Sequence, residues 1–188
     1  MAFCRKFYVS DTHFGHENII GHCNRPFSSV AEMDAYLIDQ WNSVVGPDDL
    51  VYHLGDFSVP DAAYARRIFD QLNGRKILVL GNHDERRPGS PSPHVVHLDW
   101  YRQPTSGLSV TDTDSNGQKV HIYLSHHAHR IWPQGNKGGF HFYGHSHGAI
   151  PHLGNSRDIG VDLPDVAFRP RTFVELAAGL PGLPSAIA

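Results

Sequence analysis

The chain has 188 residues, which is enough for one domain with a substantial hydrophobic core. Its 16 Lys and Arg residues against 19 Asp and Glu residues give a formal net charge of −3. That balance excludes a broad basic surface, so we expect no stable nucleic-acid partner, although metal ions could still hold a small anionic substrate. No apolar run is long enough to span a membrane or form a signal-peptide core.

The cysteines and histidines indicate the redox environment of the protein and the kind of chemistry it performs. The two cysteines, Cys4 and Cys23, form no CxxC pair, and we expect a reduced, cytoplasmic protein. The 15 histidines are the unusual feature of the composition, and they are scattered through short mixed motifs. Because imidazole is the commonest metal ligand and transfers protons near pH 7, they indicate metal or proton chemistry. The oligomeric state is not indicated.

The first half of the chain alternates predicted strands and helices. Strands are predicted over residues 3–10, 50–54 and 76–80 from their apolar runs. A helix begins with a capping box from Ser29 to Glu32 and continues to residue 45, and a second helix covers residues 60–72. This alternation predicts a parallel sheet covered by helices, with a short polar motif after each strand at one shared edge.

The second half is predicted to contain more strands. Residues 85–103 are rich in Pro, Gly and Ser and are predicted to form a surface excursion. Strands over 107–111 and 119–124 flank Asn116-Gly117, which favours an antiparallel hairpin. Further strands are expected over 139–143 and 157–161, and residues 172–178 form either a short helix or a strand and turn. We expect a single domain over residues 1–178 and a disordered tail over 179–188.

Polar donor groups follow five of these strands. Each motif alone is compatible with an ordinary turn, but together the carboxylate, imidazole and amide groups suit Mn²⁺, Fe, Ni²⁺ or Zn²⁺. They exceed what one ion needs and therefore fit two divalent metals about 3.5–4 Å apart. The eight residues are Asp11, His13, Asp56, Asn82, His83, His126, His145 and His147.

The order of these motifs resembles that of the calcineurin-like metallophosphoesterases. The matching motifs are Asp11-x-His13, Gly55-Asp56, Gly81-Asn82-His83-Asp84, a lone His126 and Gly144-His145-x-His147. The stretch from Ser10 to His16 is similar to a small bacterial and phage branch of that superfamily. The resemblance covers about residues 7–162 and implies an α/β fold in four layers, a β-sandwich of two mixed sheets flanked by α-helices.

The resemblance also implies a role for each site residue. One metal would be held by Asp11, His13 and His147, the other by Asn82, His126 and His145, and Asp56 would bridge them. A metal-bridging hydroxide would then attack phosphorus in line. His83 would donate a proton to the leaving oxygen or bind the phosphoryl group, with Asp84 orienting its ring. His16 and Arg130 are candidate contacts of the substrate phosphate.

Some assignments have alternatives. His126 is preferred over His127 and His129 as the lone ligand, since it directly follows a predicted strand, and the other two are expected to be solvated or to support a ligand. His53, inside an apolar run, is expected to pack in the core. Asp162 either orients a ligand histidine or is an ordinary turn carboxylate.

Departures from other branches narrow the expected activity. Gly55-Asp56 continues as Phe57-Ser58, and the Gly-Asn-His motif ends in Asp84 rather than Glu, which argues against a protein phosphatase. No basic amphipathic helix indicates a lipid substrate. The sequence favours a metal-dependent hydrolase of a small phosphodiester of nucleotide or cyclic-nucleotide type. A phosphomonoesterase is the alternative enzyme, and a non-catalytic metal-binding scaffold is the alternative of another class.

Overall fold

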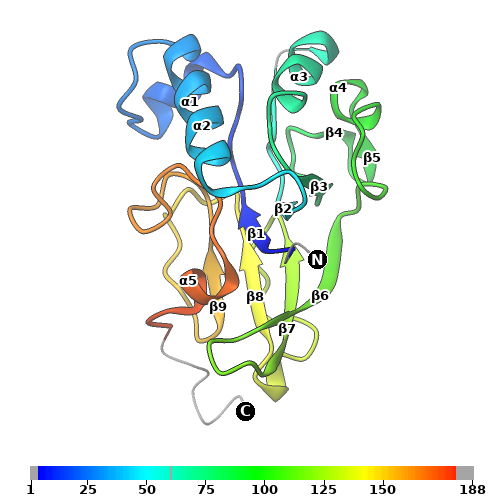
Figure 1. Cartoon of the computed structure of the whole chain (residues 1–188), viewed down its shortest axis with the longest axis vertical. Coiled ribbons are helices and arrows are strands. Elements are labelled where there is room, and N and C mark those ends of the chain that lie inside the picture. The colour runs from blue at the N-terminus through cyan, green and yellow to red at the C-terminus, as the bar shows by residue number, and fades with distance from the viewer. Residues whose placement is uncertain (1–3, 60, 181–188) are drawn as a thin grey trace.

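The computed structural model describes residues 4–59 and 61–180 (Figure 1). Its first half contains β1 (Lys6–Val9), α1 (Glu17–His22), α2 (Val30–Val44), β2 (Leu50–His53), α3 (Ala62–Phe69) and β3 (Arg75–Leu78). Its second half contains β4 (Glu85–Arg87), β5 (Ser90–Pro91), α4 (Pro93–Val96), β6 (Gly107–Thr113), β7 (Lys119–Ser125), the 3₁₀ turn η1 (Gly135–Lys137), β8 (Phe140–Tyr143), β9 (Ser156–Asp158) and α5 (Phe173–Ala177). The expected first residue of the first strand, the expected start of the second helix at residue 60 and most of the expected tail lie outside the described residues.

The first sheet has the strand order β1-β2-β3, and both pairs are parallel, as predicted. Tyr8 on the outer side of β1 adds an antiparallel bridge to Arg171. β3 ends two residues earlier than predicted because the chain beyond it pairs elsewhere: the N–H of Leu80 donates to the carbonyl of Thr105 at 2.9 Å. The carboxyl ends of the three strands therefore meet at one edge, where the polar motifs begin.

The second sheet has the order β6-β7-β8-β9 and is mixed. β6 and β7 form the predicted antiparallel hairpin, and β7-β8 and β8-β9 are parallel pairs. β9 is shorter than predicted, because the chain after it leaves this sheet. Gly160 forms a parallel bridge with Ser10, and the N–H of Val161 donates to the Ser10 carbonyl at 3.1 Å. This crossing joins the two sheets just beside Asp11.

Two hydrophobic cores give the molecule its layers. Met33, Leu37 and Trp41 of α2 are buried against the first sheet, together with apolar residues of the other helices near that face. The other face of that sheet packs on the second sheet through Tyr8, Phe142 and neighbouring side chains. Helices α1 to α4 lie at one end of the molecule and α5 lies beside the second sheet (Figure 1). The fold is thus a mixed α/β arrangement of sheets flanked by helices, as expected.

Capping side chains define the starts of α2 and α5. The Ser29 side chain caps α2 by accepting from the Glu32 N–H at 3.2 Å, but the Glu32 carboxylate binds the N–H and hydroxyl of Ser28, so the predicted capping box is only half formed. A complete capping box pairs Thr172 with Glu175 at the start of α5. It settles the open alternative for residues 172–178 in favour of a helix.

The predicted surface excursion after the third strand contains structure that composition did not indicate. It includes the short hairpin of β4 and β5 and the single turn α4. α1, a helix of six residues, was likewise not predicted. Elements this short give too few apolar repeats for periodicity to mark them.

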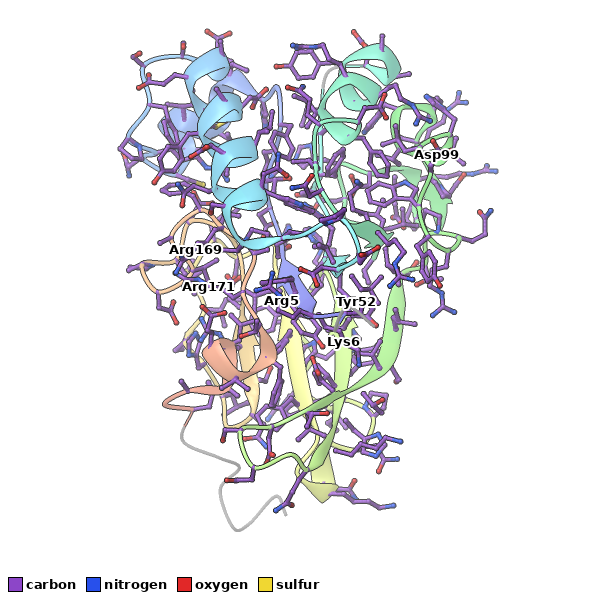
Figure 2. The ribbon with its side chains drawn as sticks, viewed as in Figure 1. Arg5, Lys6, Tyr52, Asp99, Arg169 and Arg171 are labelled. Carbon is purple, nitrogen blue, oxygen red and sulfur yellow. The ribbon has the colours of Figure 1, made fainter. Side chains whose placement is uncertain are left out.

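The end of the first sheet opposite the polar motifs is closed by polar contacts (Figure 2). Lys6 Nζ donates to the Thr111 carbonyl at 2.6 Å, and the Tyr8 hydroxyl donates to Asp112 at 2.7 Å. Arg5 pairs with Asp49 at 3.0 Å. The Lys6 and Tyr8 contacts attach β1 to β6, and the Arg5 pair ties the residue before β1 to the residue before β2. Within residues 4–59 and 61–180, no helix is long and apolar enough to cross a membrane.

Candidate metal centre

Five predicted ligands have left-handed backbone conformations. The φ angles are 60° for Asp11, 51° for His13, 57° for Asp56, 66° for His145 and 47° for His147. This conformation costs roughly 1–2 kcal/mol for a residue with a Cβ. Such strain clusters at functional sites, where the surrounding structure holds it. The loops after β1, β2 and β8 are therefore held in conformations that bring these side chains together.

A first group of donors consists of Asp11, His13 and His147, whose ligand atoms lie within 4.8 Å of one another. Asp11 is fully buried, and burial raises its pKa to about 7. His13 Nε2 is buried without a hydrogen-bond partner, 3.4 Å from Asp56 Oδ2, and burial lowers the pKa of its ring to about 2. A poorly neutralised carboxylate beside an unpartnered, neutral imidazole nitrogen fits a cation in this position.

A second group converges on the amide oxygen of Asn82. Its Oδ1 lies 2.9 Å from His145 Nδ1 and 3.0 Å from His126 Nε2. The other ring nitrogen of His126 lies 2.8 Å from the Leu54 carbonyl, which fixes the ring orientation. Burial disfavours the charged form of His126, but Asp56 and Asp11 outweigh this and raise its pKa to about 9. A metal cation bound at Nε2 would interact favourably with the nearby oxygens of Asn82 and Asp56, and the His126 ring would then be neutral.

Asp56 lies between the two groups. Its Oδ2 is 3.4 Å from His13 Nε2 and 3.5 Å from His126 Nε2, so one oxygen faces both. Its Oδ1 accepts the N–H of His83 at 2.9 Å. Burial would raise the pKa of Asp56, but His126 and His13 hold it below its usual value. Asp56 is therefore placed to bind a divalent cation together with either donor group.

The structure corrects the role expected for Asp84. Its carboxylate was expected to orient the His83 ring, but both oxygens accept backbone N–H groups instead: those of Asp56 at 2.7 Å, Gly81 at 3.0 Å and Phe57 at 3.1 Å. Asp84 is fully buried and ties the loop after β3 to the loop after β2. It therefore positions the backbone of both loops, and none of its hydrogen bonds among the described residues goes to the His83 ring.

The two proposed phosphate contacts have different surroundings. His16 Nδ1 lies 3.3 Å from His13 Nδ1, and its ring centroid lies 5.5 Å from that of His83, so His16 belongs to the site. Arg130 is exposed, and it takes part in none of the hydrogen bonds or ion pairs found in the described part of the chain. Its part in binding a phosphate therefore stays a prediction.

Arg25 is the functional residue that sequence reasoning missed. Its side chain is fully buried and forms a two-pronged ion pair with Asp162, at 2.7 and 2.9 Å. It also donates to the carbonyls of Asp11 at 2.7 Å and Thr12 at 2.9 Å. Asp162 in turn binds His147 Nδ1 at 2.6 Å, which resolves its open role in favour of orienting a ligand histidine. An arginine in a loop carries no periodic signal, so only the fold reveals this network.

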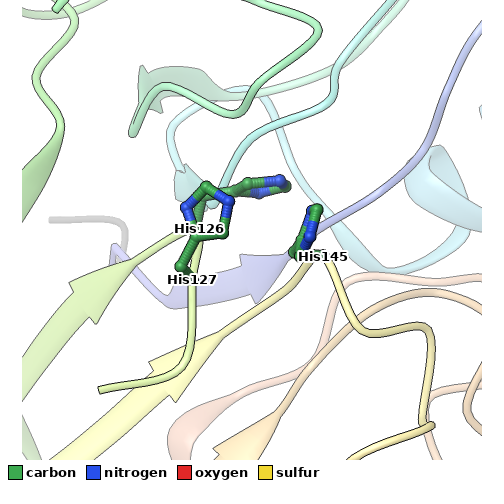
Figure 3. Close-up of side chains that lie close together, drawn as sticks. All are labelled: His126, His127 and His145. Atoms are coloured by element: carbon green, nitrogen blue, oxygen red, sulfur yellow. The ribbon is translucent and has the colours of Figure 1, made fainter. Parts of the chain in front are cut away.

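The other histidines considered for the site lie in three different surroundings. His53 is fully buried beneath it, as predicted, and forms a 2.9 Å hydrogen bond with Thr12. His129 lies against Tyr123, with ring centroids 5.3 Å apart. His127 lies beside His145 and His126, next to the second group (Figure 3).

Comparisons with known proteins agree with this arrangement. A family model described as calcineurin-like phosphoesterase matches residues 7–173. The chain is 52% identical over 84 residues to an uncharacterized protein of Methanocaldococcus jannaschii, a match that covers 43% of this chain but only 48% of that protein. It is 32% identical over 159 residues to the Gene 66 protein of Mycobacterium phage L5, covering 75% of this chain and 76% of that protein.

A solved structure shares the fold. The crystal structure of a protein of unknown function from Aquifex aeolicus superposes with a TM-score of 0.62, covering 89% of this chain and 95% of that chain at 22% identity. The chain belongs to the calcineurin-like phosphoesterase family. This family membership implies metal-dependent hydrolysis of phosphoric esters, and the phage relative agrees with the expected small bacterial and phage branch.

Proposed function

We propose that this protein is a two-metal phosphodiesterase that hydrolyses a small substrate of nucleotide or cyclic-nucleotide type. The observation that carries the proposal is the position of Asp56, one oxygen of which faces both His13 and His126. Two donor groups that share a carboxylate are the arrangement that in-line phosphoryl chemistry uses.

The residues divide the work between them. When bound, two divalent cations supply Lewis acidity and a water of lowered pKa. Asp11, His13 and His147 would hold one cation, and Asn82, His126 and His145 the other, with Asp56 between them. His83 is half-buried, its ring centroid 5.1 Å from that of His13, so it can face the substrate and donate a proton to the leaving oxygen.

The commitment of buried Arg25 to other contacts supports a diester over a monoester. Arg25 is committed to Asp162 and to two carbonyls, and exposed Arg130 forms no hydrogen bond or ion pair in the described part of the chain. A terminal phosphate dianion is usually bound by additional arginine forks. A diester carries a single negative charge, which two cations neutralise. Exposed Asn82 and His145 leave the edge open to a substituent on either side of the phosphorus.

The test is metal analysis followed by a substrate panel. Protein purified without chelator should contain close to two transition metals per chain, and metal-loaded protein should hydrolyse chromogenic diesters faster than the matched monoesters. Faster monoester hydrolysis would replace our proposal with a phosphomonoesterase. Metal binding without either activity would favour the scaffold. Cyclic and linear dinucleotides in the same panel narrow the substrate.

Variants of adjacent residues separate catalysis from metal binding. His83→Ala should keep both metals and lower kcat by about 10²–10⁴-fold, the usual value of a positioned proton donor. Asn82→Ala should lose metal, as measured by equilibrium dialysis. Metal loss in His83→Ala as well would show that His83 is a ligand and that another group supplies the proton.

A further inference from the structure

His127, to which the family motifs assign no role, lies at the second donor group. Its ring centroid is 4.4 Å from that of His145 and 4.9 Å from that of His126. One nitrogen from each of the three rings lies within 4.8 Å of the others (Figure 3). Ligands around one transition metal are separated by roughly 3–4 Å, given metal–nitrogen bonds of about 2.1 Å. Small rotations of exposed His127 would therefore bring it into the same coordination sphere.

The backbone that carries His127 is anchored from beneath. Ser125 Oγ donates to the His127 carbonyl at 2.8 Å and lies 2.8 Å from Nε2 of fully buried His141. The other nitrogen of His141 lies 2.9 Å from Ser156 Oγ. A chain of buried hydrogen bonds thus holds this turn against the second sheet. These bonds fix the backbone from which the exposed His127 ring projects, so rotation of the side chain alone carries the ring toward or away from the second donor group.

We infer that His127 is a third imidazole ligand of the cation held by Asn82, His126 and His145, and that this nitrogen-rich group prefers Ni²⁺ or Zn²⁺ to Mn²⁺. The inference rests on the proposed metal centre. Imidazole suits Zn²⁺ and Ni²⁺, whereas Mn²⁺ favours oxygen ligands. The first group has a carboxylate and two imidazoles, so the two positions differ in donor chemistry. The protein should therefore bind its two cations with different affinities and different metal preferences.

The experiment compares His127→Ala with His129→Ala, a matched exposed histidine two residues along the same loop. Calorimetric titrations of metal-free protein with Ni²⁺ and Mn²⁺ measure each affinity. His127→Ala should weaken Ni²⁺ binding at the tighter position by at least about tenfold, because even partners that only orient a ligand are worth that much. Mn²⁺ affinity should change less, and His129→Ala should match the wild type. Equal Ni²⁺ affinity in His127→Ala and wild type would overturn the inference.

A spectroscopic readout separates this inference from the proposed function. In Co²⁺-loaded protein, each bound histidine gives a strongly shifted, exchangeable ring N–H resonance in the proton NMR spectrum. His127→Ala should lose one such resonance and keep the others. An unchanged count would rule out His127 as a ligand while leaving the two-metal centre in place. Absence of any shifted resonance from wild-type protein saturated with Co²⁺ would instead contradict both proposals.

Discussion

At the scale of single residues, Arg25 shows how a side chain away from the reacting atoms can define a metal site. Its guanidinium reaches the carbonyls of Asp11 and Thr12 and, through Asp162, the ring of His147. The buried guanidinium of Arg25 therefore holds the loop after β1 directly and positions the last histidine of the Gly-His-x-His motif through Asp162. Lysine carries the same charge but lacks the planar fork that makes these contacts together.

We predict that Arg25→Lys weakens the first donor group selectively. Affinity for the cation held by Asp11, His13 and His147 should fall by about 10–100-fold, and binding to the second group should change less, since Arg25 does not contact it. A two-site metal titration measures both values. The control Arg130→Lys, at an exposed position, should bind metals as the wild type does. Equal losses at both positions would show that Arg25 stabilises the whole fold instead of one half of the centre.

Other residue roles could be predicted only in part. Type and spacing indicated Asp11, His13, Asp56 and their partners, because these donors occur in short motifs after recognisable strands. The role of Asp84 could not be predicted from spacing, since an ionised side chain next to a histidine suggests a bond to that ring. In the structure, three nearby backbone N–H groups bind the carboxylate instead. Which partner prevails depends on loop geometry, which the sequence does not display.

At the scale of elements, the ends of β2 and β3 approach so closely that only glycine fits between them. A Cβ on Gly55 would lie 2.5 Å from His126 Nδ1 and 2.6 Å from the Cα of Gly81. A Cβ on Gly81 would lie 2.9 Å from His126 Cε1 and would also collide with the Asp56 carboxylate. The two glycines thus allow the Asp56 carboxylate and His126 to share one edge of the sheet.

We predict that Gly81→Ala displaces Asp56 and His126. The variant should lose bound metal while the metal-free protein still folds. Metal content after dialysis against a weak chelator, compared with the thermal midpoint of the metal-free protein, measures the two effects. The control is Gly21→Ala, inside α1 with no atom within 4 Å of the added Cβ, which should stabilise the helix by roughly 0.5–1 kcal/mol. Wild-type metal content in Gly81→Ala would contradict the close approach.

At the scale of the whole molecule, buried histidines outside the metal centre make stability sensitive to acid. His53 and His141 are fully buried, and burial lowers the pKa of each to about 3. An unfolded chain protonates them near pH 6.5, so between pH 6.5 and 3 the unfolded state binds more protons than the folded one. Each residue therefore contributes stability that is present above pH 6.5 and is lost as the pH falls.

We predict that going from pH 7 to pH 5 removes about 2 kcal/mol of unfolding free energy for each of these two histidines. Urea unfolding of metal-free protein at both pH values measures the loss. In His141→Gln the loss should shrink by about that amount, whereas His121→Gln, at an exposed position on β7, should behave as the wild type. An unchanged pH dependence in His141→Gln would mean that His141 is charged in the folded protein.

The sequence by itself determined the parallel pairing of the first sheet, the hairpin and the candidate donor residues, because apolar runs, helix periodicity and short polar motifs are local signals. Only the tertiary structure decided which donors face one another, because residues far apart in the chain, such as Asp11 and His145 with a separation of 134 residues, meet where the strand ends converge. It also brought buried Arg25 and exposed His127 to the centre. Arg25 belongs to no recognisable motif, the sequence left His127 as an alternative to His126, and contacts between distant loops follow from packing.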